Sequence, residues 1–165
     1  LWFEWNLIRI LLFDYTHMDK KLIVSHLEVV LKGQISELSI EINSVNEEIA
    51  KETKSSAGDK FETSREMMNQ ERGRLEERMA HLKRQFNVLM GFQQDKVSTL
   101  VENGALVATA SHLLFFGLAF GKLIINDKVV MVLSLNSPIG KAFVSKQKGD
   151  LITFMNQQHI IKSIY

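Results

Sequence analysis

The feature that most constrains the fold is a series of apolar residues at helical spacing between positions 31 and 49. The steps between them alternate between four and three residues: Leu31, Ile35, Leu38, Ile42, Val45 and Ile49. This is the alternation of the a and d positions of a heptad, which places these side chains along one side of a long helix. Charged and polar residues fill the other positions, so the pattern predicts a narrow coiled-coil seam rather than a broad face turned to a globular core.

A second stretch with the same spacing follows a short break. The residues from Lys54 to Asp59 are mostly small and polar, a composition that ends one helix and begins another. The apolar residues beyond it, with steps that alternate from Leu75 onward, are Met68, Leu75, Met79, Leu82, Phe86 and Leu89. Because neither helix can bury its seam alone, the sequence predicts an antiparallel hairpin roughly 50 Å long at 1.5 Å per residue.

The sequence changes character after residue 96. Short apolar or β-branched stretches follow, separated by glycines and polar turns, at 105–110, 112–120, 129–135, 151–154 and 160–164. They predict the strands of a small antiparallel sheet, and Asn126-Asp127 has the composition of a hairpin turn.

One short helix is predicted within this second region. The only proline in the chain, Pro138, follows Ser137, an arrangement typical of an N-cap and the first helical position. The helix would cover one face of the sheet through Ile139, Ala142 and Phe143. The fold class is therefore α+β, with an antiparallel coiled-coil hairpin over residues 18–96 and a small sheet domain over residues 97–165.

The first seventeen residues differ from both regions. They are strongly apolar, yet they carry Glu4, Arg9 and Asp14, which fits neither a transmembrane span nor a signal peptide. Because Met18 directly precedes the first helical pattern, residues 1–17 are either an upstream extension outside the functional protein or a helix that packs on the hairpin or on a partner. We expect no membrane association.

Composition and charge narrow the functional classes. The apolar content of 45% is ordinary for a folded chain, and the absence of cysteine excludes disulfides and favours a reducing compartment such as the cytoplasm. Residues 18–96 hold 14 acidic and 13 basic side chains, whereas residues 97–165 hold 3 acidic side chains and 6 lysines. Such a small surplus is not the basic stripe of a nucleic-acid-binding domain.

The candidate site lies between the two helices. The sequence has no phosphate-binding glycine loop, no pair of histidines at metal-ligand spacing and no cysteine nucleophile. Asp59 and Glu62, however, lie three residues apart where the second helix begins, on one side of its first turn. One interpretation is ordinary helix capping. The other is a pair of hard oxygen ligands that complete an Mg²⁺ site on a partner.

Two local stretches resemble the GreA/GreB transcript-cleavage factors. Gly58-Asp59-Lys60-Phe61-Glu62 is similar to the G-D-x-x-E of that family. The sequence Asn-Ser-Pro-Ile-Gly-Lys-Ala at 136–142, followed by Lys-Gly-Asp at 148–150, is similar to the family's S-P-[IL]-G-[KR]-A and downstream G-D. The order of parts agrees as well, so the resemblance covers about residues 18–165.

The resemblance implies an FKBP-like C-terminal domain that docks on the rim of the secondary channel of bacterial RNA polymerase. The implied docking residues are Ser137, Pro138, Ile139, Gly140 and Lys141. It also implies that Asp59 and Glu62 pass through the channel and help to hold a catalytic Mg²⁺ and a water molecule at the 3′ end of backtracked RNA. The chain would then be a monomeric factor that stimulates the polymerase's own RNA cleavage, and not an enzyme itself.

The tip also departs from the family pattern. Family members often have asparagine after the glutamate and then an aromatic residue and an arginine; here Thr63 follows Glu62. Arg65 and Arg72 are the candidates to replace the arginine. The neighbourhood where the family's aromatic residue and arginine would fall is occupied by Met67, Met68 and Gln70.

Three alternatives remain open at this point. The nearest is a regulator that inserts the same hairpin into the polymerase without promoting cleavage, which the altered tip favours. The second is a structural adaptor that uses its seam to pair with another helix or with a second copy of itself. Prolyl isomerase activity ranks last, because an FKBP-like fold does not by itself carry that function.

Overall fold

The computed structural model describes residues 19–52, 59–92 and 95–165; the side chains at positions 52 and 59–61 lie outside this description. The interpretation of residues 1–17 and most of the expected turn at 54–59 also fall outside it. The described residues form two compact units. We call residues 26–91 the arm, and residues 19–25 together with 92–165 the sheet unit.

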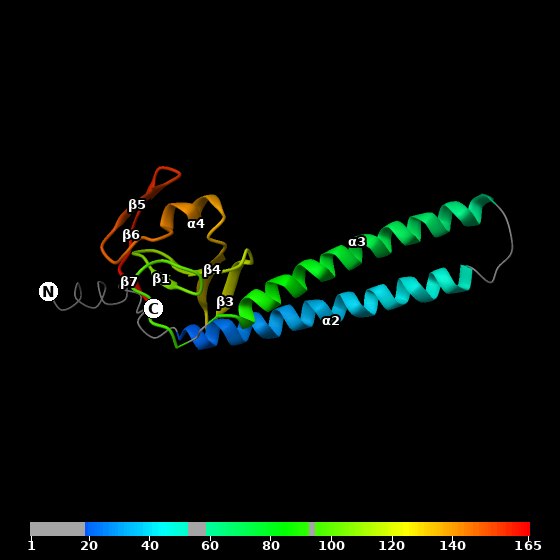
Figure 1. Ribbon diagram of the computed structural model, residues 1–165, viewed down its shortest axis with the longest axis horizontal. Coiled ribbons are helices and arrows are strands. Elements are labelled where there is room, and N and C mark those ends of the chain that lie inside the picture. The colour runs from blue at the N-terminus through cyan, green and yellow to red at the C-terminus, as the bar shows by residue number, and fades with distance from the viewer. Residues whose placement is uncertain (1–18, 53–58, 93–94) are drawn as a thin grey trace. The chain divides into compact units, whose positions relative to one another are not determined.

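The arm is a pair of long helices that run side by side in opposite directions (Figure 1). Helix α2 spans Lys20–Glu52 and helix α3 spans Asp59–Met90, with 33 and 32 residues. The N-cap of α2 is Asp19, whose carboxylate accepts a hydrogen bond of 2.9 Å from the backbone amide of Lys21. The predicted helical hairpin is confirmed. None of the described helices has the length and apolar character needed to cross a membrane.

Two side-chain contacts set the register of the helix pair. The ammonium of Lys32 lies 5.6 Å from the centre of the Phe86 ring, and the guanidinium of Arg72 donates a 3.4 Å hydrogen bond to the side-chain oxygen of Asn46. The two contacts are separated by the same number of residues in α2, from 32 to 46, as in α3, from 72 to 86. The register is therefore constant between these levels, and the predicted seam residues of both helices fall at matching heights.

The seam is buried unevenly along the arm. Every predicted seam residue is buried or half-buried, whereas most positions between them are exposed. Leu31 and Leu38 are 0% and 3% exposed, and Leu75 is 5% exposed. The seam residues nearer the end of α2 and the start of α3 are only half-buried: Ile42, Val45, Ile49 and Met68. We call the first turn of α3, residues 59–62, the tip.

One position of the seam is polar. Continuing the heptad steps from Met68 to Leu75 places Arg72 in the seam, and its side chain is 38% exposed. Besides its hydrogen bond to Asn46, the Arg72 guanidinium lies 3.8 Å from a carboxylate oxygen of Glu76. A polar residue at such a position fixes register at some cost in stability.

The sheet unit contains a five-stranded sheet and a separate two-stranded ribbon. The five strands lie in the order β3-β4-β2-β1-β7, and β5 pairs with β6. The bounds are β1 Leu106–Ala108, β2 Leu113–Phe116, β3 Gly121–Ile125, β4 Lys128–Leu133, β5 Leu151–Phe154, β6 Gln157–Ile160 and β7 Ser163–Ile164. The predicted small sheet with one short helix is confirmed.

The sheet is mixed rather than wholly antiparallel, because β2 and β4 run parallel. The chain reverses once between β2 and β3 and again at the β3-β4 hairpin, so β4 returns in the direction of β2. The second reversal is the predicted turn: Asn126 and Asp127 have φ angles of 48° and 61°, and they connect the paired residues Ile125 and Lys128. Two positive φ values in a two-residue loop are typical of a type I′ hairpin turn.

The core of the sheet unit lies between the sheet and helix α4, which spans Pro138–Phe143. Phe143 is fully buried, and its ring lies 5.5 Å from that of Phe116. Ile139 and Ala142 pack against the same core, as predicted. All four residues of β2 are buried, which explains its continuous apolar sequence. On β2, Phe115 meets the ring of Phe92 edge-on, at 5.8 Å between centroids.

Candidate functional site

The two residues predicted at the tip, Asp59 and Glu62, lie on one helical turn. Helix α3 begins at Asp59, and Glu62 follows three residues later with an exposed side chain. The side chain of Asp59 is outside the described part of the chain. Residues three apart on a helix are neighbours on its surface, and the free N–H groups and the dipole of a helix N-terminus favour anionic groups there.

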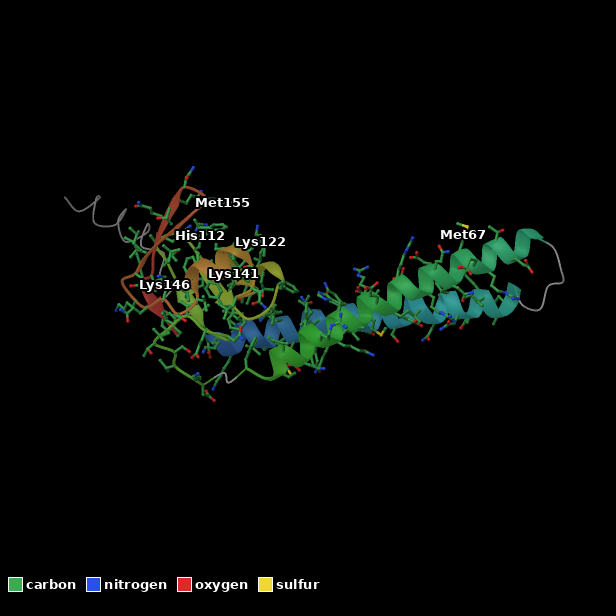
Figure 2. All side chains as sticks on the ribbon, turned by 45° about the horizontal axis from the view of Figure 1, so that its top comes forward. Met67, His112, Lys122, Lys141, Lys146 and Met155 are labelled. Atoms are coloured by element: carbon green, nitrogen blue, oxygen red, sulfur yellow. The ribbon has the colours of Figure 1, made fainter. Side chains whose placement is uncertain are left out.

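The residues that flank the tip do not play equal roles. Arg65 is exposed in the second turn of α3, whereas Arg72 is held in the seam by its contacts with Asn46 and Glu76. Of the two arginines considered as replacements for the family arginine, only Arg65 is placed on the surface near the tip. Met67 points away from α2 (Figure 2) and is 66% exposed, which is unusual for a methionine in a helix pair with an apolar seam.

The described residues contain no group of three or more histidine, aspartate or glutamate side chains that could hold a metal ion. The carboxyl groups of Asp59 and Glu62 are of the ligand type that Mg²⁺ prefers, because this ion is commonly held by one or two carboxylates together with water and phosphate oxygens.

Most residues of the predicted docking segment have a structural role in helix α4. The Ser137 hydroxyl accepts a 3.1 Å hydrogen bond from the amide of Gly140 and donates a 2.6 Å bond to the carbonyl of Ser134. Pro138 occupies the first turn of the helix. A Cβ on Gly140 would lie 2.1 Å from the carbonyl oxygen of Ser134, so only glycine fits there.

The downstream pair Gly149-Asp150 also has a structural role, because it forms a turn. Gly149 has a φ of 95°, in the left-handed region that favours glycine. The Asp150 carboxylate accepts a 2.9 Å hydrogen bond from the amide of Gln147 and closes the turn.

Of the predicted docking residues, Pro138 and Lys141 are exposed, while Ile139 is half-buried. These two exposed side chains are the ones available to a partner.

A group of charged residues ties the start of α2 to the loop before the sheet. Lys20 is 6% exposed, and its ammonium donates a 2.7 Å hydrogen bond to the carbonyl of Lys96. The Lys96 ammonium lies 2.8 Å from the Glu102 carboxylate, which also accepts a 2.7 Å hydrogen bond from Ser98. Lys21 pairs with Asp95 at 2.6 Å.

The contacts in this group shift the pKa of its members in different directions. Hydrogen bonds from Lys96 and Ser98 hold the pKa of Glu102 below its usual value, and the contact with Asp95 raises the pKa of Lys21. Burial lowers the pKa of Lys20. The sequence did not predict this group, because its members lie on either side of the hairpin.

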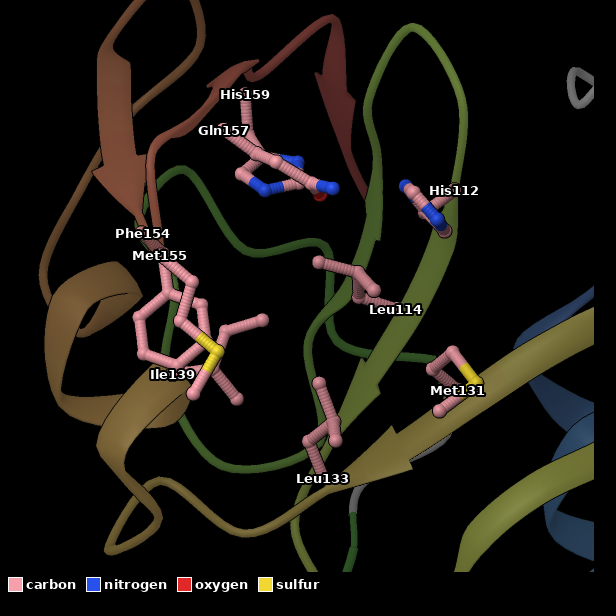
Figure 3. Close-up of a pocket in the computed structure, with 9 residues that line it drawn as sticks. All are labelled: His112, Leu114, Met131, Leu133, Ile139, Phe154, Met155, Gln157 and His159. Atoms are coloured by element: carbon pink, nitrogen blue, oxygen red, sulfur yellow. The ribbon is translucent and has the colours of Figure 1, made fainter.

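A pocket in the sheet unit was also missed (Figure 3). Its volume is about 270 Å³, and its apolar lining residues are Leu114, Met131, Leu133, Ile139, Phe154 and Met155. His112, Gln157 and His159 lie along one side of it. These residues come from the sheet, from α4 and from the β5-β6 ribbon, and nothing in their local sequence indicates that they meet.

No protein-family model and no curated relative matches the chain. Among solved structures, the chain is similar to GreA factor homolog 1 of Thermus thermophilus, with 17% sequence identity over 84% of this chain and 94% of that chain, and a TM-score of 0.33. At this identity and TM-score, the likeness establishes neither family membership nor function.

Proposed function

We propose that this chain is a transcription elongation factor that places its tip in the secondary channel of RNA polymerase and stimulates cleavage of backtracked RNA. The observation that carries the proposal is the position of Asp59 and Glu62 on the first turn of α3, at the end of a two-helix arm. A pair of helices encloses no cavity that could shield a reaction from water. The exposed carboxylate of Glu62, with Asp59 on the same helical turn, is therefore suited to act in the site of another molecule.

The chemistry expected of the tip is that of an added ligand set. In phosphodiester hydrolysis, a second Mg²⁺ lowers the pKa of the attacking water and stabilises the developing charge. The carboxylates of Asp59 and Glu62 would supply two of the oxygen ligands that this ion requires. The arm would contribute their position, because reacting groups held in the correct geometry react far faster than freely diffusing ones.

The sheet unit is the part proposed to bind the outside of the polymerase. Pro138 at the start of α4 and Lys141 one turn later are both exposed. They present a small apolar surface and a positive charge close together. We assign the first contact with the polymerase to this end of α4, with Ser137 and Gly140 maintaining its conformation.

A cleavage assay on a stalled, backtracked elongation complex tests the proposal. RNA labelled at its 5′ end is incubated with Mg²⁺ and the full chain, and shortening at the 3′ end is followed over time. We expect the wild-type chain to accelerate shortening, and Asp59→Asn and Glu62→Gln each to abolish the acceleration while retaining polymerase binding. Glu77→Gln, which changes an exposed carboxylate farther along α3, is the matched control and should behave as wild type.

The altered tip supports one second candidate. Met67 is exposed and Arg72 is held in the seam, so the tip lacks most of the flanking groups of the family. A chain that binds polymerase and slows RNA synthesis, yet leaves backtracked RNA at full length, would be a channel regulator without cleavage activity. If the chain does not bind polymerase at all, it is neither a cleavage factor nor a channel regulator, and the proposal is wrong.

A further inference from the structure

The pocket between the sheet, α4 and the β5-β6 ribbon has features of a ligand site that the tip chemistry does not use. Its volume of about 270 Å³ exceeds the roughly 150 Å³ of an apolar cavity that accepts benzene. Met155 at its edge is 82% exposed, so the pocket borders solvent. Met131, Met155 and Phe154 among its lining residues are groups that pack favourably against an aromatic ring.

One polar group in this pocket lacks a partner. His159 is 7% exposed, and its Nδ1 is buried with no hydrogen-bond partner among the described residues. Its ring is held by packing, at 5.9 Å from the ring of Phe143 and 5.8 Å from that of His112. Figure 3 shows the imidazole directed into the pocket beside Gln157. Buried imidazoles are normally hydrogen-bonded, so this arrangement indicates a place for a polar atom of a ligand.

The charges of the lining residues restrict the ligand further. The pocket has no lysine, arginine, aspartate or glutamate among its lining residues, so neither an anion nor a cation would find a counter-charge. Burial, with a smaller contribution from His112, lowers the pKa of His159 and so favours the neutral imidazole. A neutral imidazole has one donor and one acceptor nitrogen. A hydroxyl group can donate to it or accept from it, whichever tautomer is present.

We propose that this pocket binds a neutral phenolic ring, with the ring among the apolar side chains and the hydroxyl hydrogen-bonded to the imidazole of His159. The ring is either that of a free phenol or that of a tyrosine presented by another polypeptide, since the two share the same chemistry. The site does not use the tip carboxylates, and it shares one residue, Ile139, with the predicted docking segment.

Binding is measured on the full chain by NMR, with amide and imidazole ¹⁵N shifts recorded during titration. The probes are p-cresol, toluene as the same ring without the hydroxyl, and N-acetyltyrosinamide as a tyrosine in a peptide setting. We expect p-cresol to bind about tenfold more tightly than toluene, as one hydrogen bond of about 1.4 kcal/mol would give. The amides around Leu114, Phe154 and His159 should shift, together with the His159 ring nitrogens.

Two variants make the test specific. In His159→Phe the advantage of p-cresol over toluene should disappear, whereas His81→Phe, at an exposed position of α3, should retain it. Binding of N-acetyltyrosinamide would identify a polypeptide as the source of the ring, and its failure beside p-cresol binding would identify a free phenol. Equal affinity for toluene and p-cresol in the wild type, or no saturable shift at millimolar p-cresol, would overturn the proposal. The ring-nitrogen shifts keep the test decisive if His159→Phe fails to fold.

Discussion

Gly140 lies directly against the backbone of Ser134, so that a Cβ at position 140 would stand 2.1 Å from the Ser134 carbonyl oxygen. The neighbouring atoms of Leu135 that such a Cβ would meet also belong to the backbone, at 2.7 and 2.8 Å. Backbone atoms cannot move aside as a flexible side chain can. Helix α4 therefore sits where it does because position 140 has no side chain.

The first prediction follows from this contact. Gly140→Ala should lower the free energy of unfolding by about 1–3 kcal/mol, the usual cost of forcing extra volume into a packed site. Gly73→Ala is the matched control, because a Cβ at position 73 of α3 has nothing within 4 Å. It should raise stability by about 0.5–1 kcal/mol through the higher helix propensity of alanine. Urea unfolding followed by circular dichroism measures both changes; equal effects would contradict the close contact.

The second prediction concerns the polar position of the coiled-coil seam. Arg72→Leu should stabilise the arm by about 1 kcal/mol, because an apolar side chain there adds to the buried surface between α2 and α3. Arg74→Leu is the control: the Arg74 side chain is 76% exposed, so leucine at that position should give no gain. Thermal unfolding of the two variants checks the difference. A loss of stability in Arg72→Leu would mean that the contact with Asn46 matters more than the apolar seam.

The third prediction separates the residues that build α4 from those offered to a partner. Ser137→Ala removes an N-cap and should cost about 1 kcal/mol of stability. Lys141→Glu reverses an exposed charge and should leave stability within about 0.5 kcal/mol of wild type while weakening binding to RNA polymerase. Thermal unfolding and a polymerase pull-down read the two effects separately. Unchanged polymerase binding in Lys141→Glu would remove this residue from the proposed docking surface.

The fourth prediction concerns acid stability. The pKa of Glu102 is lowered in the folded chain by hydrogen bonds from Lys96 and Ser98, so its carboxylate stabilises the fold above the usual glutamate pKa of 4.5. This contribution is lost as the pH falls through the lowered value. We expect the wild type to lose stability below pH 4.5 more steeply than Glu102→Gln, which has no charge to lose. Urea unfolding at several pH values between 3 and 7 compares the slopes, and parallel slopes would exclude a role for this carboxylate.

The features that could be predicted from sequence are those whose signal is local. The seam from Leu31 to Ile49 repeats at a period set by helix geometry, and the turn at Asn126-Asp127 uses residues that accept positive φ. The turn between β5 and β6 has similar φ values, 47° at Met155 and 61° at Asn156. Methionine has no preference for such turns, so that ribbon was only partly identified.

The features that were missed depend on tertiary contacts. The parallel pairing of β2 with β4 follows from two chain reversals and not from either strand's composition. The pocket brings His112 and His159 to 5.8 Å between ring centroids, although each is an isolated histidine in the sequence. Of the candidate site, the positions of Asp59 and Glu62 at the start of α3 could be predicted. The N-cap role of Ser137 could also be predicted, from the Ser137-Pro138 pair, whereas the close approach of Gly140 to the Ser134 carbonyl became apparent only with the path of the 134–140 backbone.

The uneven burial of the seam gives the two halves of the arm different resistance to opening. Thermal separation of α2 from α3 costs least where the facing side chains are already half in contact with water, at Val45, Ile49 and Met68. Separation costs more free energy at Leu38 and Leu75, which are almost fully buried. We therefore expect the outer turns of the arm to separate at a lower cost in free energy than the turns around Leu38 and Leu75.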